Sequence, residues 1–113
     1  MRWGLLFAFL LAGCSKGPDA DLQYIKQARS VAAEWALVNE QASQGKLTQT
    51  YVASMHQWLR DQLQTSSKAL SQPDSPYGDE IRTLLQQPDG APAEDFRAHS
   101  DKLKQIEHSL ESA

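Results

Sequence analysis

The sequence predicts an all-α protein: an antiparallel helical hairpin, extended by a short and a longer helix into a small three- to four-helix bundle. Apolar residues recur at steps of three and four along three long stretches, which is the spacing of a packed helix face. Clusters of proline and glycine separate these stretches, and no stretch alternates with the period of two that is typical of strands. We therefore expect residues 21–113 to form one helical domain.

The first helix is predicted over residues 21–44. Its apolar residues follow one another at steps of 4, 3, 4, 3 and 4: Tyr24, Ala28, Val31, Trp35, Val38 and Ala42. Asp19 or Asp21 is expected to cap its start, and Gly45 suits the left-handed residue that follows a helix end. Apolar residues in 32–38 surround more of the helix than one neighbouring helix explains.

The second helix is predicted over residues 49–70. Thr48 is its expected N-cap, and Leu47 is expected to pack on Val52 as a hydrophobic staple. The apolar residues on or near one face are Tyr51, Met55, Trp58, Leu59, Leu63 and Leu70. Since both long helices have similar lengths and a short connection with a glycine joins them, they should form an antiparallel hairpin.

Two further helices follow the hairpin. Ser75 as N-cap and Pro76 at the first helical position predict a short helix over residues 76–87. After the break at 88–92, a last helix is predicted over 93–111. Its apolar stripe consists of Phe96, His99, Leu103, Ile106 and Leu110.

Residues 1–13 have the layout of a secretory signal peptide. A positive charge at Arg2 precedes an apolar run over residues 5–12 that ends in small side chains. The run is too short to cross a bilayer, which takes about 20 apolar residues. We therefore expect residues 1–13 to be removed as a signal peptide.

The four residues Leu11-Ala12-Gly13-Cys14 resemble the bacterial lipobox. The resemblance implies cleavage between Gly13 and Cys14, a diacylglycerol group on the Cys14 thiol, and an acyl chain of the palmitate type on its amine. Two or three acyl chains make a stable membrane anchor, whereas one does not. Residues 14–20 are then the lipidated cysteine and a short tether. Because Ser15 is not aspartate, the resemblance favours the periplasmic face of the outer membrane in a Gram-negative cell.

Charge and cysteine content exclude several classes of function. Loss of Arg2 with the signal peptide leaves 10 basic and 14 acidic residues, and the basic residues are scattered singly. Nucleic-acid binding would require them on one face, so we expect no nucleic-acid partner. Cys14 is the only cysteine, and therefore the chain can form no internal disulfide and offers no catalytic thiol apart from the lipidation site.

No candidate residues have the spacing that metal binding or catalysis requires. His99 is expected at the boundary of the core, and His56 and His108 in solvent; none of the three is spaced three or four residues from another. Glu34 and Glu40 are six residues apart and would not share a helix face. We therefore predict neither a metal site nor a catalytic residue, no cofactor besides the lipid, and no enzymatic activity.

The predicted function is that of a small, lipid-anchored, non-catalytic cell-envelope protein that contacts an envelope protein or itself. Trp35 and Trp58 are interpreted as core aromatics or as parts of a partner surface, with Leu37 and Val52 as first candidates for a second contact surface. The alternative is a carrier that holds a small apolar ligand between its helices. Such a carrier would have a cavity among four residues: Trp35, Met55, Trp58 and Leu103.

Overall fold

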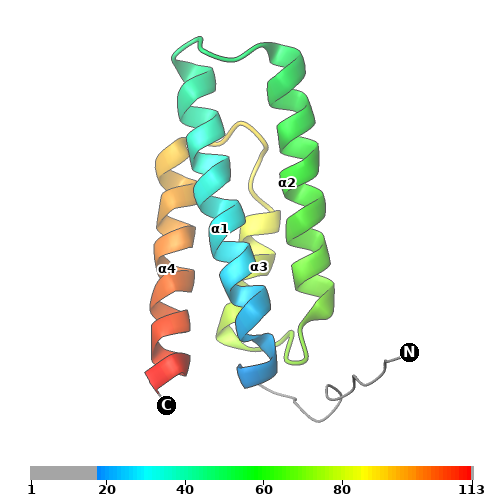
Figure 1. Ribbon diagram of the computed structural model, residues 1–113, viewed down its shortest axis with the longest axis vertical. Helices are drawn as coiled ribbons and strands as arrows, with labels where there is room; N and C mark the ends of the chain where they lie inside the picture. The colour runs from blue at the N-terminus through cyan, green and yellow to red at the C-terminus, as the bar shows by residue number, and fades with distance from the viewer. Residues whose placement is uncertain (1–17, 113) are drawn as a thin grey trace, which may run out of the picture.

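The computed structural model describes residues 18–112, which form four helices and no strand. The helices are α1 (Pro18–Ser43), α2 (Gln49–Ala69), α3 (Pro76–Leu85) and α4 (Ala93–Ser112). The predicted all-α bundle is thus confirmed (Figure 1). The predicted signal peptide and lipobox lie outside the described residues. Within residues 18–112, no helix combines the length and the apolar character that crossing a bilayer requires.

The four helices run alternately up and down, with α1 at the centre of the bundle (Figure 1). The helix α1 packs against α2 on one side and α4 on the other, and the backbones of these two flanking helices are not adjacent. The short α3 contacts the other three helices and covers one side of the α1–α2 pair. As predicted, α1 and α2 form an antiparallel hairpin.

The predicted helix ends agree with the structure except at a few positions. Gly45 has a φ of 73°, the Thr48 side chain accepts a hydrogen bond from the Tyr51 N–H, and the Ser75 side chain accepts one from the Gly78 N–H. The helix α1 begins three residues before the predicted start, so residues 18–20 are helical and are not part of the tether. A proline is favoured in the first helical turn because its φ is already helical and it has no N–H to satisfy.

The core is built mainly around α1. Seven of its apolar residues are buried: Ile25, Ala28, Val31, Ala32, Trp35, Ala36 and Val38. The other large buried side chains come from all three remaining helices: Leu59 and Leu63, Tyr77, Ile81 and Leu84, and Phe96 and Leu103. Since α1 has neighbours on two sides, it needs an apolar surface wider than one stripe, which accounts for the apolar character of residues 32–38.

The structure corrects the prediction that Asp21 caps the start of the first helix. It lies inside α1 and is buried, where its carboxylate accepts hydrogen bonds from the N–H groups of Ser71 (2.7 Å) and Gln72 (3.1 Å). The Tyr77 hydroxyl donates a third bond, of 2.7 Å. Asp21 therefore holds the turn between α2 and α3 against the start of α1.

These contacts shift the pKa of both ionisable partners. Burial alone would raise the pKa of Asp21, but the hydrogen bonds from Ser71, Tyr77 and Gln72 outweigh it and hold that pKa below 3.8. Burial, together with the Asp21 carboxylate, raises the pKa of Tyr77 to about 12. Asp21 is thus a buried carboxylate that is ionised at neutral pH.

Gly78 allows α3 to approach the turn before it. A Cβ atom at this position would lie 2.1 Å from the Pro73 carbonyl oxygen and 2.7 Å from its carbon. Both contacts are with backbone atoms, which cannot rotate away. The absence of a side chain is therefore required here for packing.

We expect Gly78→Ala to lower the free energy of unfolding by about 1–2 kcal/mol, because the added methyl group forces α3 away from Pro73. Helix propensity alone would predict a gain of up to about 1 kcal/mol. The two mechanisms therefore differ in sign, and urea unfolding followed by circular dichroism distinguishes them. Gly90→Ala is the matched control, since nothing lies within 4 Å of a Cβ there; a gain in stability at Gly78 would contradict the packing argument.

Candidate functional site

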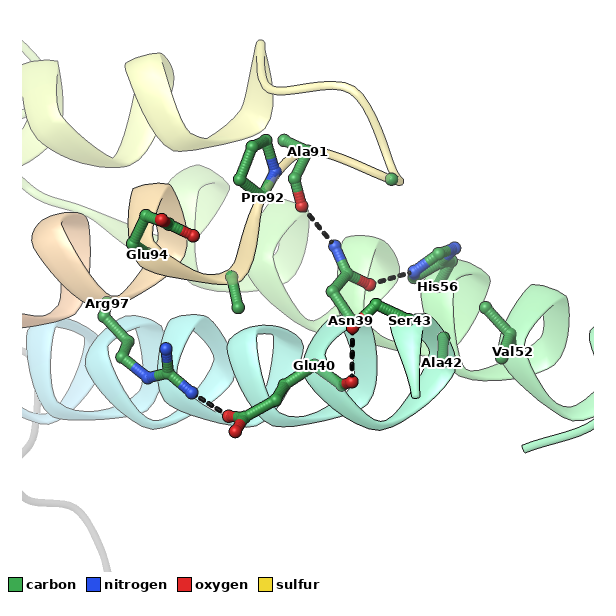
Figure 2. A pocket seen from close by; sticks show the side chains of 12 residues that line it. Asn39, Glu40, Ala42, Ser43, Val52, His56, Ala91, Pro92, Glu94 and Arg97 are labelled. Carbon is green, nitrogen blue, oxygen red and sulfur yellow. Dashed lines mark hydrogen bonds and ion pairs between the residues drawn. The ribbon is translucent and has the colours of Figure 1, made fainter. Parts of the chain in front are cut away.

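A polar cluster fixes the loop between α3 and α4 onto the hairpin. The Trp35 indole Nε1–H donates to the Asp89 carbonyl oxygen at 3.0 Å. The Asn39 side-chain amide donates to the same oxygen at 2.9 Å and to the Ala91 carbonyl oxygen at 2.8 Å. Figure 2 shows Asn39 between Ala91 and the ring of His56. One turn of α1 thus holds the backbone of the whole loop.

Arg60, on α2, completes this cluster from the other side. Its guanidinium donates to the carbonyl oxygens of Leu85 (2.7 Å) and Gln87 (3.0 Å), at the end of α3. It also pairs with the Asp89 carboxylate at 2.6 Å and lies 5.0 Å from the Trp35 ring centroid. Arginine suits this position because its planar fork satisfies several acceptors at once.

His56 belongs to the same cluster, so the prediction that it lies in solvent is wrong. Because both Asn39 amide hydrogens are directed to carbonyl oxygens, Asn39 Oδ1 faces the imidazole, and the His56 Nε2–H donates to it at 2.7 Å. Burial lowers the pKa of His56 below 6.5; nearby Asp89 acts against that shift and Arg60 reinforces it. His56 is therefore a neutral hydrogen-bond donor at neutral pH.

The other two histidines lie where the sequence predicts. His99 is largely buried at the edge of the core, where its Nδ1–H donates to Glu80. His108 is exposed. In the part of the chain that the structure describes, no three His, Cys, Asp or Glu residues come together as metal ligands.

A pocket of about 630 Å³ opens beside the polar cluster (Figure 2). Its lining mixes charged, polar and small apolar groups from α1, α2, the α3–α4 loop and the start of α4: Asn39, Glu40, Ala42, Ser43, Val52, His56, Gly90, Ala91, Pro92, Ala93, Glu94 and Arg97. Arg97 is paired with Glu40, and the Ser43 hydroxyl donates to the Glu40 carbonyl oxygen at 2.7 Å. The polar groups of the lining thus bind other groups of the same chain. We therefore interpret the polar cluster as the contacts that hold the α3–α4 loop in place.

The second surface feature is an apolar groove along the outer face of the hairpin. Among residues 18–112, the large apolar side chains left exposed are Leu37, Tyr51 and Trp58, at 52%, 49% and 49%. Trp58 precedes Arg60 by two residues, which places the two about 200° apart around α2. Since Arg60 faces the α3–α4 loop, Trp58 faces the opposite side, away from that loop.

The groove has two stretches that share Glu34 and Trp58. The stretch nearer the hairpin turn is lined by Glu34, Tyr51, Ser54, Met55 and Trp58. The stretch nearer the start of α1 is lined by Gln23, Lys26, Gln27, Ser30, Val31, Glu34 and Trp58. On α1, Leu37 lies on the same stripe as Ser30, at a step of seven residues. We call this surface, Leu37 included, the hairpin groove.

The structure separates the residues predicted for a partner surface. Leu37 and Trp58 are exposed, and Trp58 lines both stretches of the hairpin groove. Trp35 is fully buried and stacks on Phe96 at 4.8 Å, so its assignment to a partner surface is wrong. Val52 packs against the core and lines the pocket beside Asn39, on a different face from Trp58.

The four residues expected to enclose an apolar ligand do not line one cavity. Trp35 and Leu103 are fully buried in the closed core, whereas Trp58 is half exposed and, with Met55, lines the hairpin groove. The expectation assumed that hairpin geometry brings both tryptophans to the interior. Only Trp35 faces it, because α4 packs over Trp35 and no helix covers the side of α2 that carries Trp58.

Fold and surface together define a small all-α bundle with a closed core and one open groove between its two longest helices. Comparison with known proteins finds no matching family model, no matching curated protein and no matching solved structure.

Proposed function

We propose that this chain is a lipoprotein precursor whose mature form is anchored by lipid on Cys14 and acts, without catalysis, by binding a protein of the cell envelope through the hairpin groove. The single observation that carries the contact surface is the exposure of Leu37, Tyr51 and Trp58, which helix spacing places on the groove side of the hairpin. A bundle of this size can bury such side chains, as it does Trp35 and Phe96. Apolar side chains grouped on one face are typical of interaction sites, and tryptophan and tyrosine are frequent hot spots in them.

The anchor supports the same proposal. With residues 18–20 in α1, residues 14–17 are left as the predicted tether, and four residues reach at most about 14 Å. The bundle would then work next to the membrane surface. A small protein held there meets other membrane-bound proteins at a raised effective concentration, so a modest groove suffices for binding.

The carrier of a small apolar ligand remains the alternative function, but no specific observation favours it. The pocket beside Asn39 is of ligand size. However, Glu40, Glu94 and Arg97 at its walls would have to be desolvated by an apolar guest.

The anchor is tested by Cys14→Ala in the full-length chain with a carboxy-terminal tag. We expect the wild type to incorporate labelled palmitate and to sediment with membranes, and the variant to lose both properties, because no acyl chain is attached. Ser15→Ala is the control and should behave as the wild type. Membrane association and label that persist in Cys14→Ala would contradict the anchor.

The groove is tested by placing a photo-crosslinking amino acid at Ser54 of the full-length, membrane-bound chain. We expect a defined adduct with an envelope protein, and we expect Trp58→Ala to lower its yield about tenfold or more, as truncation of a hot-spot aromatic does. Gln105→Ala, an exposed change on α4, should leave the yield unchanged. A set of adducts unaffected by Trp58→Ala, or no adduct at all, would overturn the proposal.

A further inference from the structure

We infer that the hairpin groove recognises a lysine or arginine side chain on an otherwise apolar helix of the partner, with Glu34 as the counter-charge. This inference rests on the proposed function and adds the chemistry of the partner. The juxtaposition that carries it is a carboxylate on α1 that lines the same groove as exposed aromatic side chains on α2: Glu34 lines both stretches of the groove, and so does Trp58.

Glu34 makes no ion pair with any residue of 18–112, and the cations of the hairpin helices are directed elsewhere. On α1, Lys26 pairs with Glu111 at 3.0 Å and Arg29 with Glu107 at 2.9 Å, both on α4. On α2, Arg60 pairs with Asp89.

Neither of the remaining lysines of this region lines the groove. Lys68 is ten residues from Trp58, or about 15 Å along α2, and Lys46 is in the hairpin turn. The groove therefore carries a negative charge that its own chain does not neutralise.

The surroundings of Glu34 suit a long cationic side chain. The faces of Trp58 and Tyr51 attract a cation at close range. Met55 and the indole offer apolar surface for the methylene stem, while the charged head meets the carboxylate. Lysine and arginine combine such a stem with such a head.

The same carboxylate decides against other occupants. A purely apolar helix would bury the Glu34 carboxylate without a counter-charge. The desolvation free energy of that carboxylate exceeds the free energy gained by burying the apolar side chains beside it. An acidic partner would be repelled. A second copy of this chain would bring its own Glu34 toward the groove, and the one cation that lines the groove, Lys26, is already paired with Glu111. The chain as a whole is acidic, with 14 acidic against 11 basic residues, which also favours a basic partner.

The helical form of the partner follows from the shape of the groove. On α1 the lining residues run from Gln23 to Glu34, and the exposed Leu37 follows about one turn later, which together makes about 21 Å of helix at 1.5 Å per residue. A partner helix of about 14 residues spans that length and would lie along the hairpin as an additional helix of the bundle, with apolar side chains at steps of three and four.

The experiment uses the membrane-bound full-length chain with the photo-crosslinking amino acid at Ser54, in combination with charge variants at position 34. We expect Glu34→Gln to lower the adduct yield about threefold and Glu34→Lys about tenfold or more, since the second change repels the cation. Asp101→Lys, the same reversal at an exposed site on α4, should leave the yield unchanged. Equal circular dichroism melts of all variants establish that each is folded. Mass spectrometry of the adduct should map the crosslink to a helix with lysine or arginine within one turn.

The outcomes separate this inference from the proposed function. If Trp58→Ala abolishes the adduct while Glu34→Lys does not, the groove binds a partner but the cationic chemistry is wrong. If the adduct is a second copy of the chain or a phospholipid, the inference is likewise overturned. If no adduct forms from Ser54 or from Leu37, the proposed docking function itself fails.

Discussion

Trp35→Ala is expected to lower the free energy of unfolding by about 3–5 kcal/mol, as truncation of a fully buried large aromatic does. The indole is the largest fully buried side chain among residues 18–112, and it stacks on Phe96 with ring centroids 4.8 Å apart. Its removal leaves a void between α1 and α4 that surrounding side chains fill only in part. It also leaves the Asp89 carbonyl oxygen with Asn39 as its remaining donor. Urea unfolding of the full chain in mild detergent, followed by far-ultraviolet circular dichroism, measures this loss.

Trp35→Phe separates the two contributions of the indole. The phenyl ring retains most of the stacking on Phe96 but has no N–H for Asp89, so we expect a loss of about 1–2 kcal/mol. Trp58→Ala is the matched control on the surface, because the same residue type is truncated where half of it is exposed. It should change stability by less than about 1 kcal/mol. Equal losses for Trp35→Ala and Trp58→Ala would contradict the burial that distinguishes them.

The helices of this protein were predictable because local signals define them. Periodicity located the three longer helices, Ser75 and Pro76 located α3, and the residues that cap α2 and α3, Thr48 and Ser75, act as predicted. These signals involve residues three or four positions apart, so a linear sequence contains them. The start of α1 was misplaced since Asp19 and Asp21 are both competent caps, and only the tertiary contacts of Asp21 decide its role.

The orientation of the two tryptophans was not predictable from the same periodicity. Both lie on apolar stripes, but the stripe of α2 is covered only where α1 and α3 pack on it. The apolar periodicity of a helix predicts which residues share a face. The positions of the other helices determine which of its faces is buried. That information is absent from either helix taken alone.

The polar cluster was missed because its partners are far apart in the chain. Trp35 and Asn39 lie 54 and 50 residues from Asp89. One local signal was present: Trp35 and Asn39, like His56 and Arg60, are four residues apart, so each pair shares a helix face. These two pairs lie on facing helices, and a Pro-Asp-Gly turn follows later in the chain. The pattern predicts that the pairs bind this turn only when the turn is already known to lie against the hairpin.

Asp21→Ala is expected to lower the free energy of unfolding at pH 7 by about 2–3 kcal/mol. The variant leaves the N–H groups of Ser71 and Gln72 and the Tyr77 hydroxyl without the carboxylate that accepts from them. Loss of a charged acceptor costs more than loss of a neutral one, and water reaches the exposed turn only in part. Asp21→Asn keeps the volume but has one acceptor oxygen in place of two, so its loss should be smaller. Asp19→Ala, at an exposed position two residues before Asp21, is the control and should change stability little.

The pH dependence distinguishes a charge effect at Asp21 from a packing effect. Because its folded-state pKa lies below the ordinary 3.8, the ionised carboxylate stabilises the fold fully above that unfolded-state value. The stabilisation is lost as pH falls through the folded-state pKa. The stability difference between wild type and Asp21→Asn should therefore be constant from neutral pH down to about 5 and should shrink progressively below about 3.8. Burial of His56 as a neutral ring affects both proteins equally and cancels in the difference. A difference that does not change with pH would mean that the Asp21 side chain acts by its shape alone.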